Sequence, residues 1–457
     1  MNSELSPVKQ WAQLSPSLYA LYTERESYTW RQLAEKVERI SLSLSEQGVS
    51  VGDVVTCVAK NSPDLLFLYL ACLERGAICA LCMPQSEVEL AHKLNSLYGN
   101  SQAAYFWSDQ QGVLPDTCKA LKLTETDSAS HSSNYDAQSP ASIVFTSGST
   151  GSPKAVVHNS AQHLASATGL LEKFHFKQGN TWLLSLPMYH VSGLAIVYRW
   201  LATGASLKIG TGHLHEDISK VSHASLVATQ LKRLLESGVT LSLSHVLLGG
   251  SHVPLELSQQ AMAKGIETWL GYGMTEAAST VTAKRIDSTY SAGYVLPKRS
   301  IELRGQRIFI GGETLALGYY MQGNITPLTD DGWFDSKDLG QWLGEELSII
   351  GRADNQFISG GENIHCEEIE AVLTQLEAVQ QTIVVPVEDS EYGYRPVAVL
   401  QCESLPKQAE IEALLQANLT RFKWPIAYYQ LPNDFVTSGI KVSRHEVKHW
   451  LESEMRK

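Results

Sequence analysis

Residues 146–154 read Thr-Ser-Gly-Ser-Thr-Gly-Ser-Pro-Lys and directly follow the apolar run at residues 143–145. Glycines permit turns and close approach of backbone N–H groups to an anion, hydroxyls donate hydrogen bonds, and Lys154 adds a positive charge. The composition therefore suits a phosphate-binding loop, and equally a polar surface loop after a strand. A P-loop is excluded, because the segment lacks G-x-x-x-x-G-K-[ST] and no Ser or Thr follows Lys154.

The elements that position this loop are read from hydrophobic spacing. Apolar residues at three- and four-residue intervals predict helices over residues 28–48 and 63–76, and apolar runs predict strands at 54–59 and 77–83. Short apolar runs that end in small or polar residues recur at four further places, residues 182–186, 224–228, 245–250 and 267–271. This alternation predicts an α/β fold with parallel strands, whose carboxyl ends carry the chemistry.

The chain length predicts at least two domains, because 457 residues exceed the roughly 250–300 at which a single core stops growing. A β-rich stretch over residues 307–350 ends near Gly351, and an α+β alternation follows it. We expect a large domain over residues 1–353, with α/β subdomains and a β-rich part, and a small α+β domain over residues 354–457.

The net charge of −12 argues against a general basic surface for nucleic acid, so local positive groups must meet an anionic substrate. The seven cysteines are scattered through mostly apolar runs, and the single C-x-x-C at residues 79–82 lacks a second pair, so buried thiols are expected rather than zinc or a redox dithiol. No signal peptide and no run of 18 apolar residues is found. A protein of the cytoplasm with no membrane or nucleic-acid partner is the expectation.

Four more constellations follow the opening loop in order. They are Gly-Tyr-Gly-Met-Thr-Glu at 271–276, Asp-Gly-Trp-Phe-Asp-Ser-Lys-Asp-Leu-Gly at 331–340, Gly-Arg-Ala-Asp at 351–354 running into Ser-Gly-Gly-Glu-Asn-Ile at 359–364, and Gly-Ile-Lys-Val-Ser-Arg at 439–444. In this order the five motifs resemble the core motifs of the adenylate-forming superfamily, over roughly residues 140 to 445. Within it, the chain is similar to the bacterial o-succinylbenzoate:CoA ligases of menaquinone biosynthesis. The cues are residues 186–193 with Tyr-Arg-Trp at 198–200, residues 223–231, and residues 438–444.

The resemblance implies two half-reactions that use ATP, Mg²⁺ and CoA. A carboxylate and ATP give an acyl-adenylate and pyrophosphate, and a thiol then displaces AMP. Because a weak nucleophile must approach a phosphorus surrounded by negative oxygens, the site must position groups and neutralise charge. The resemblance assigns ATP β- and γ-phosphate contacts to the opening loop: Thr146, Ser147, Gly148, Ser149, Thr150, Gly151 and Lys154.

The other nucleotide contacts come from the later motifs. Glu276 is expected to hold Mg²⁺, with a helix-start glutamate as the alternative. Thr275 is expected to bond the α-phosphate or the substrate carboxylate. The adenine is expected against Tyr272 and the turn Gly249, Gly250 and Ser251, although a plain strand-to-loop turn explains those glycines nearly as well.

The ribose is assigned to Asp338, since a carboxylate accepts from two hydroxyls at once. Most relatives carry Thr-Gly-Asp where this chain has Ser-Lys-Asp at 336–338, so the loop before Asp338 is expected to differ. Arg352 is expected to contact ribose or phosphate, with a structural ion pair as the alternative.

Lys441 is assigned to catalysis of adenylation, because a point charge on a mobile domain reaches the reacting groups only when the lid closes. Ile440 separates it from Gly439, where relatives have Gly-Lys, but the Lys-x-x-Arg spacing to Arg444 is kept. Asp354 lies where the family has its hinge, and the alternative is a plain interdomain aspartate. The C-terminal domain is expected to rotate there after the adenylate forms.

The acid pocket is assigned to His190, Ser192 and Arg199. A dicarboxylate needs a second cation beyond its reacting end, and Arg199 lies in an apolar run with helical spacing, where its planar fork suits a carboxylate. A buried ion pair is the alternative for Arg199, and simple packing is the alternative for His190, which is otherwise a catalytic gate or substrate contact.

Three alternatives to an o-succinylbenzoate ligase are weighed. An acyl-CoA synthetase for another aryl or short-chain acid differs only in its pocket. A regulatory protein with an inactive adenylation fold is disfavoured, because all the principal charged residues are present: Lys154, Glu276, Asp338, Arg352 and Lys441. A P-loop kinase or ATPase lacks its motif. The expected partners are the small molecules o-succinylbenzoate, ATP and CoA, with a homo-oligomer left open.

Overall fold

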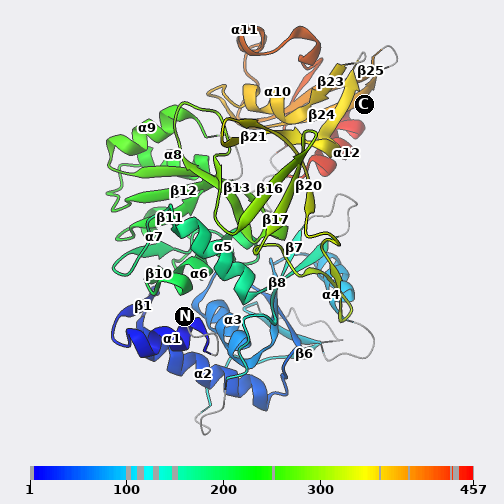
Figure 1. Cartoon of the computed structure of the whole chain (residues 1–457). Helices are drawn as coiled ribbons and strands as arrows, with labels where there is room; N and C mark the ends of the chain where they lie inside the picture. Colours follow the sequence, from blue (N-terminus) through cyan, green and yellow to red (C-terminus); the bar gives the residue numbers. More distant parts are fainter. Residues whose placement is uncertain are drawn as a thin grey trace. The chain divides into compact units, whose positions relative to one another are not determined.

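The structure is a computed structural model of the 457-residue chain (Figure 1). It describes residues 5–98, 104–110, 118–126, 133–146, 153–249, 253–359, 362–389, 392–432, 435 and 442–455. Two compact units divide the chain: residues 1–301 with 310–334, and residues 302–309 with 335–457. The boundary expected after Ala353 falls within the second unit, because the β-rich residues 335–352 group with the C-terminal residues.

The first unit contains two large mixed sheets in its described part. The first has, in spatial order, β15 (Tyr294–Val295), β14 (Ser279–Arg285), β13 (Glu267–Met274), β12 (His245–Gly249), β11 (His223–Leu226), β9 (Thr181–Leu183), β10 (Ser206–Lys208), β1 (Tyr19–Tyr22) and β2 (Ser27–Thr29). The second has β19 (Asn324–Pro327), β18 (Gly318–Met321), β8 (Lys154–Asn159), β7 (Pro140–Thr146), β4 (Ile78–Cys82), β3 (Val54–Val58), β5 (Tyr105–Ser108) and β6 (Lys119–Ala120).

Both sheets have a parallel centre with antiparallel strands added at an edge. Strands β9 to β13 and β1 run parallel, as do β3, β4, β5, β6 and β7, whereas β14 and β8 pair antiparallel with their neighbours. The predicted α/β class with parallel strands is therefore confirmed for the sheet centres. The antiparallel additions were not predicted.

Helices of the first unit follow from the spacing of their apolar residues and from their caps. They are α1 (Pro7–Leu14), α2 (Trp30–Glu46), α3 (Pro63–Arg75), α4 (Glu87–Leu97), α5 (Ser160–Leu171), α6 (Val191–Thr203), α7 (Leu214–Asp217), α8 (Ala228–Glu236) and α9 (Leu255–Ala263). Helix α2 starts at a capping box formed by Thr29 and Gln32, and α3 begins with Pro63 and ends at Gly76 in the left-handed conformation. Both predicted helices are confirmed.

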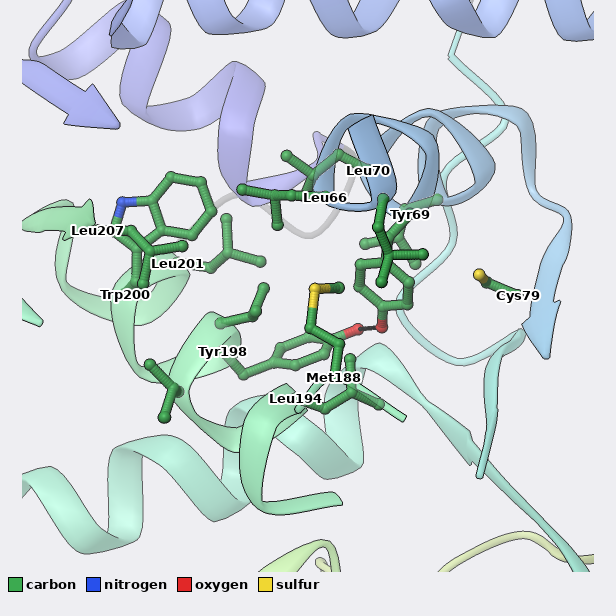
Figure 2. Close-up of a cluster of buried hydrophobic side chains, with 14 of the residues drawn as sticks. Leu66, Tyr69, Leu70, Cys79, Met188, Leu194, Tyr198, Trp200, Leu201 and Leu207 are labelled. Carbon is green, nitrogen blue, oxygen red and sulfur yellow. Dashed lines mark hydrogen bonds between the residues drawn. The ribbon is translucent and has the colours of Figure 1, made fainter. Parts of the chain in front are cut away.

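One buried cluster joins α3, α6 and strands of both sheets. Leu66, Tyr69 and Leu70 of α3 face Leu194, Tyr198 and Leu201 of α6, with Cys79 of β4 and Leu207 of β10 in the same cluster (Figure 2). The Tyr69 and Tyr198 hydroxyls are 2.8 Å apart and hydrogen-bond to each other. Helix α6, which carries Arg199, is thus held in place by core packing.

The second unit contains two smaller sheets. One is built from β16 (Arg299–Arg304), β17 (Arg307–Gly312), β20 (Phe334–Leu343) and β21 (Glu346–Arg352), of which residues 302–309 and 335–352 belong to this unit. The other contains β22 (Gln356–Ser359), β23 (Glu362–His365), β24 (Val379–Asp389), β25 (Gly393–Cys402) and β26 (Tyr428–Gln430). Helices α10 (Cys366–Leu373), α11 (Gln408–Asn418) and α12 (Arg444–Glu454) complete it. The large N-terminal part and the smaller α+β C-terminal part are as predicted.

Candidate active site

The opening motif is the connection of the β7–β8 hairpin. Thr146 ends β7, Lys154 begins β8, and the two residues are partners in the antiparallel register. The apolar run at residues 143–145 lies within β7, and both ends of the motif are neighbours. Five residues assigned to the phosphates lie outside the described residues: Ser147, Gly148, Ser149, Thr150 and Gly151.

Lys154 and Glu276 meet at one tyrosine of β18. The Lys154 ammonium lies 4.9 Å from the centre of the Tyr319 ring. The Tyr319 hydroxyl donates a hydrogen bond of 3.3 Å to Oε1 of Glu276. Burial, and then the charge of Glu276, raise the pKa of Tyr319, so the phenol stays protonated and remains a donor. Tyr319 thus contacts both Lys154, which is assigned to the phosphates, and Glu276, which is assigned to Mg²⁺.

Thr275 and Glu276 lie in a single 3₁₀ turn, Thr275–Ala277, between β13 and β14. The Glu276 carbonyl accepts a hydrogen bond of 2.8 Å from the N–H of Ala316. Ala278 and Ser279 follow with φ of 50° and 85°, a conformation that costs non-glycine residues free energy. Glu276 is therefore not the first-turn residue of an α-helix, and the dipole explanation for it is not supported.

Gly273 is required by close packing within this hairpin. A Cβ atom at this position would lie 1.7 Å from the Ser279 carbonyl oxygen. Any side chain would force β13 away from the strand that follows the turn, so the glycine of the motif sets the approach of the two strands.

The carboxyl ends of the parallel strands place the adenine candidates side by side. Gly249 at the end of β12 pairs in register with Gly271 of β13, and Tyr272 is the next residue along β13. These residues lie at the sheet edge where the sequence predicts the chemistry, and their contact with adenine stays a prediction. Gly250 and Ser251 lie outside the described residues.

The acid-pocket residues belong to α6 and the turn before it. His190 is the N-cap of α6, Ser192 is its second residue, and the His190 ring packs edge-on against Tyr189 at 4.9 Å. Burial, and then the charge of Lys93, lower the pKa of His190, which favours the neutral ring. Gly193 makes the tight turn possible, because a Cβ there would lie 2.1 Å from the Pro187 carbonyl oxygen.

Arg199 is a buried cation with only 2% of its surface exposed. Its guanidinium donates a hydrogen bond of 3.2 Å to Thr280 Oγ1 and lies 5.2 Å from the centre of the Trp182 ring. Its Nε has no hydrogen-bond partner, and no carboxylate of the described residues lies within 4.0 Å. Burial, and then Arg299, lower the pKa of Arg199 to about 9. The ion pair considered as an alternative is not found among these residues.

In the second unit, Arg352 joins two of the predicted residues. Its Nη1 lies 3.3 Å from Asp338, and its Nε and Nη2 donate bonds of 3.1 and 3.2 Å to the Asp354 carboxylate. Asp354 sits in the 3₁₀ turn Ala353–Asn355 between β21 and β22. The ion pairing considered as an alternative for Arg352 is therefore present, and its contact with ribose or phosphate stays a prediction.

The departure from Thr-Gly-Asp has a backbone explanation. Lys337 has φ of 61°, in the left-handed region that favours glycine. Two hydrogen bonds support this conformation: Ser336 Oγ accepts from the N–H of Asp338 and donates to the Ile308 carbonyl. The turn before the aspartate thus takes a glycine-type conformation without a glycine.

Lys441 lies outside the described residues, but Arg444 of the same motif is placed. Arg444 begins α12 and pairs with Glu367 and Glu370 of α10. These pairs anchor the chain three residues after Lys441.

Two residues around the Thr275–Glu276 turn were missed by sequence reasoning. Tyr319 was read only as part of a β-rich stretch, and Arg299 carried no motif or periodic spacing. Tyr319 contacts Glu276 of the turn, and Arg299 contacts Ser166, whose hydroxyl donates to the Ala278 carbonyl after the turn. Pairing signals of this range are not visible in one sequence.

None of the seven cysteines forms a disulfide and six of them are buried, as predicted. Among the described residues, no group of three or more His, Cys, Asp and Glu side chains is arranged to hold a metal ion. No helix found in the described ranges is long and apolar enough to cross a membrane.

Comparison with known proteins agrees with this geometry. The family model described as "AMP-binding enzyme" matches residues 8–320. The 2-succinylbenzoate–CoA ligase of Haemophilus influenzae is 42% identical over 94% of this chain and 94% of that protein, and the Escherichia coli enzyme of the same name is 37% identical over 98% of each.

Two solved structures extend the comparison. An arginine-to-lysine variant of E. coli MenE with bound OSB-AMS superposes with a TM-score of 0.90, at 36% identity and 99% coverage of both chains. The Bacillus subtilis o-succinylbenzoate CoA synthetase in complex with ATP and magnesium ion superposes with a TM-score of 0.84. It is 25% identical, and the match covers 93% of this chain and 95% of that chain. The chain is an AMP-forming acid–CoA ligase that belongs to the AMP-binding enzyme family and, within it, to the 2-succinylbenzoate–CoA ligases.

Proposed function

We propose that this protein joins o-succinylbenzoate to CoA at the expense of ATP, in menaquinone biosynthesis. The carboxylate attacks the α-phosphorus of ATP and pyrophosphate leaves; the CoA thiolate then attacks the acyl carbon and AMP leaves. The observation that carries the choice of a dicarboxylate is Arg199, a buried guanidinium without a carboxylate partner among the described residues. Such a cation is costly until an anion neutralises it.

In the first half-reaction the first unit binds the triphosphate. Residues Thr146 to Lys154 are assigned to the β- and γ-phosphates, and the Lys154 ammonium stabilises the departing pyrophosphate. Thr275 donates to the α-phosphate or to the substrate carboxylate. The adenine lies against Gly249 and Tyr272, which the register of β12 and β13 brings together.

The carboxylate of Glu276 suits Mg²⁺. Tyr319 donates to its Oε1, and Oε2 has no partner among the described residues, which leaves a hard oxygen directed by a fixed turn. Bound Mg²⁺ supplies charge neutralisation between phosphate oxygens. The role of this chain's residues is to hold Glu276 close to Lys154.

In the second unit, Asp338 is proposed for the ribose and Lys441 for adenylation. Asp338 accepts from the ribose hydroxyls, with Arg352 holding its carboxylate in place. Lys441 stabilises the pentavalent α-phosphate while the acid attacks, and Arg444 anchors its segment through Glu367 and Glu370. Rotation at Asp354 then withdraws Lys441 and admits CoA.

The acid itself is held by α6. Arg199 binds the carboxylate that does not react, with Trp182 beneath the guanidinium and Thr280 beside it. His190 and Ser192 lie at the start of the helix, two turns before Arg199, and contact the acid closer to its reacting end. An acid without the second carboxylate leaves Arg199 unpaired and is a poor substrate.

The cytoplasm is the proposed location, since seven cysteines that form no disulfide suit a reducing compartment. The function is tested with a panel of acids in an AMP-release assay, with and without CoA. O-succinylbenzoate should give CoA-dependent AMP release far above that of benzoate, acetate or succinate. Equal rates for a monocarboxylic aryl acid would favour the alternative of a general acyl-CoA synthetase.

A further inference from the structure

A second buried arginine lies in the first unit, at the start of β16. Arg299 is only 6% exposed, and its guanidinium makes three hydrogen bonds of 2.8 Å. Nη1 donates to the Pro297 carbonyl, and Nη2 donates to both the carbonyl and the hydroxyl of Ser166 in α5. No carboxylate of the described residues lies within ion-pair distance of it. Burying a positive charge without a carboxylate beside it costs desolvation free energy, so Arg299 is expected to have a specific role.

Helix α5 has a space shaped for this guanidinium. A Cβ atom at Gly169 would lie 2.2 Å from Arg299 Nη1 and 2.4 Å from the Pro297 carbonyl oxygen. Gly169 stands within the helix, where glycine is unfavourable, and its φ is not left-handed. Gly169 therefore allows the Arg299 guanidinium to approach the backbone of α5 closely. Any larger residue at position 169 would displace that side chain.

Ser166 connects Arg299 to the turn that contains Thr275 and Glu276, the candidate phosphate and metal residues. Its hydroxyl accepts from Arg299 and donates to the carbonyl of Ala278. Ala278 is two residues after Glu276, and it and Ser279 are in the left-handed conformation. Without an external support, these residues would relax towards conformations that favour them, and the turn would move.

We propose that Arg299 is a positioning residue for the adenylation step, which holds Ala278 through Ser166 and so fixes the turn that presents Thr275 and Glu276. The proposal rests on the proposed function, in that it takes this turn to bind ATP and Mg²⁺. Two of the three guanidinium bonds go to Ser166, one to its carbonyl and one to its hydroxyl. The bond to the hydroxyl holds the serine side chain in one rotamer, and the hydroxyl proton is then directed at the Ala278 carbonyl. A charged donor strengthens that bond, because each hydrogen bond of a chain polarises the next.

Four variants of the full-length protein test this. Arg299→Gln removes the positive charge, and Arg299→Lys keeps the charge but loses the planar guanidinium. Ser166→Ala removes the hydroxyl that links Arg299 to the Ala278 carbonyl. The double variant Arg299→Gln/Ser166→Ala combines the first and third changes. Ser43→Ala is the matched control, because Ser43 is also a buried helical serine, 4% exposed, with its hydroxyl 2.7 Å from that of Thr124. Circular dichroism and thermal unfolding establish the folded fraction of each.

The readouts are the affinity for ATP at graded Mg²⁺ concentrations, by calorimetry, and kcat and KM for each substrate. Arg299→Gln and Ser166→Ala should each weaken Mg·ATP binding or lower kcat by about tenfold, and raise the Mg²⁺ concentration for half-saturation. KM for the acid should stay within about twofold in Ser166→Ala, which leaves both buried arginines in place. Arg299→Lys should lie between these variants and the wild type, and the double variant should match the worse single variant.

Several results would overturn the proposal. These are folded variants with unchanged Mg²⁺ dependence, effects confined to KM for the acid, or effects that multiply in the double variant. If Arg299→Gln does not fold, Ser166→Ala decides, and wild-type Mg²⁺ dependence in that variant contradicts the proposal. If the wild type binds Mg·ATP but does not convert o-succinylbenzoate, only the proposed function is contradicted. The role of Arg299 can still be tested in that case, because the binding measurement needs no acid.

Discussion

Tyr319 donates a hydrogen bond of 3.3 Å to the Glu276 carboxylate, while its ring lies under the Lys154 ammonium at 4.9 Å. One side chain of β18 thus supports both the base of the phosphate loop and the candidate Mg²⁺ ligand. These three residues come from positions up to 165 apart in the chain, since 319 − 154 = 165. The pairing of β18 with β8 brings Tyr319 close to Lys154, and the hydrogen bond from the Ala316 N–H to the Glu276 carbonyl holds Glu276 beside the start of β18.

Two replacements separate the two contacts of this tyrosine. Tyr319→Phe keeps the ring but loses the hydrogen bond, so half-saturation by Mg²⁺ should need about two- to fivefold more Mg²⁺. Tyr319→Leu loses the ring as well, and kcat/KM for ATP should fall at least about tenfold. Tyr19→Phe, at an exposed site, is the control. Equal kinetics for both Tyr319 variants and the control would rule out its role at the site.

Arg199 predicts opposite effects on stability and activity. Arg199→Met removes a buried charge that has no carboxylate partner among the described residues, so the free protein should unfold at an equal or higher temperature. Its kcat/KM for o-succinylbenzoate should fall about 100-fold, with KM for ATP within about threefold, because the lost contact is a charged hydrogen bond to the acid. Arg199→Ala with unchanged kcat/KM for o-succinylbenzoate would remove this residue from the pocket.

Two glycines at the same sheet edge should respond differently to alanine. Gly273→Ala places a Cβ 1.7 Å from the Ser279 carbonyl and should destabilise the fold by more than about 2 kcal/mol. Gly249→Ala meets only the Gly271 carbonyl at 3.8 Å, so its stability should be nearly unchanged while KM for ATP rises. Urea unfolding and steady-state kinetics measure both. A stable, active Gly273→Ala variant would contradict the described hairpin.

A stacked histidine pair predicts loss of stability in acid. The rings of His223 and His245 are parallel at 4.9 Å, and burial lowers the pKa of His223 to about 4. In the unfolded chain His223 binds a proton near pH 6.5, whereas in the folded protein it stays neutral until the pH is about 4. The stability that depends on the neutral ring is therefore fully present above pH 6.5, and it is lost as the pH falls towards about 4.

The test is the slope of the unfolding free energy with pH. His223→Phe should reduce the slope between pH 6 and 5 by up to about 1.4 kcal/mol per pH unit, whereas His213→Gln at an exposed position should not. A wild-type stability that is flat over this interval would show that these histidines do not titrate as their burial requires.

Asp354 gives a prediction about the order of the two half-reactions. Asp354→Pro limits backbone rotation in the turn between β21 and β22. Thioester formation should slow by more than ATP–pyrophosphate exchange does, because only the second half-reaction needs the rotated domain. Arg352→Lys is a useful comparison, since it weakens the ion pair to Asp354 without restricting the backbone. Equal loss of both half-reactions in Asp354→Pro would reject the hinge.

The sequence predicted elements whose signals are local. Spacing and caps sufficed for α2 and α3, and the motif at 271–276 marked the turn with Thr275 and Glu276. The antiparallel additions to the sheets were missed, because the partner of β14 or β8 depends on long-range pairing. Arg199 was correctly read as unusual in an apolar helix, but only coordinates could show that no carboxylate in the described part of the chain lies within ion-pair distance of it.

The most direct test of the central claim is trapping of the intermediate. Wild-type protein is mixed with ATP, Mg²⁺ and o-succinylbenzoate in a single turnover without CoA, quenched, and analysed by mass spectrometry. The proposed function predicts an o-succinylbenzoyl-adenylate in amounts close to the enzyme, which disappears into o-succinylbenzoyl-CoA and AMP when CoA is added. No adenylate with o-succinylbenzoate, together with an adenylate from a monocarboxylic acid, would contradict it.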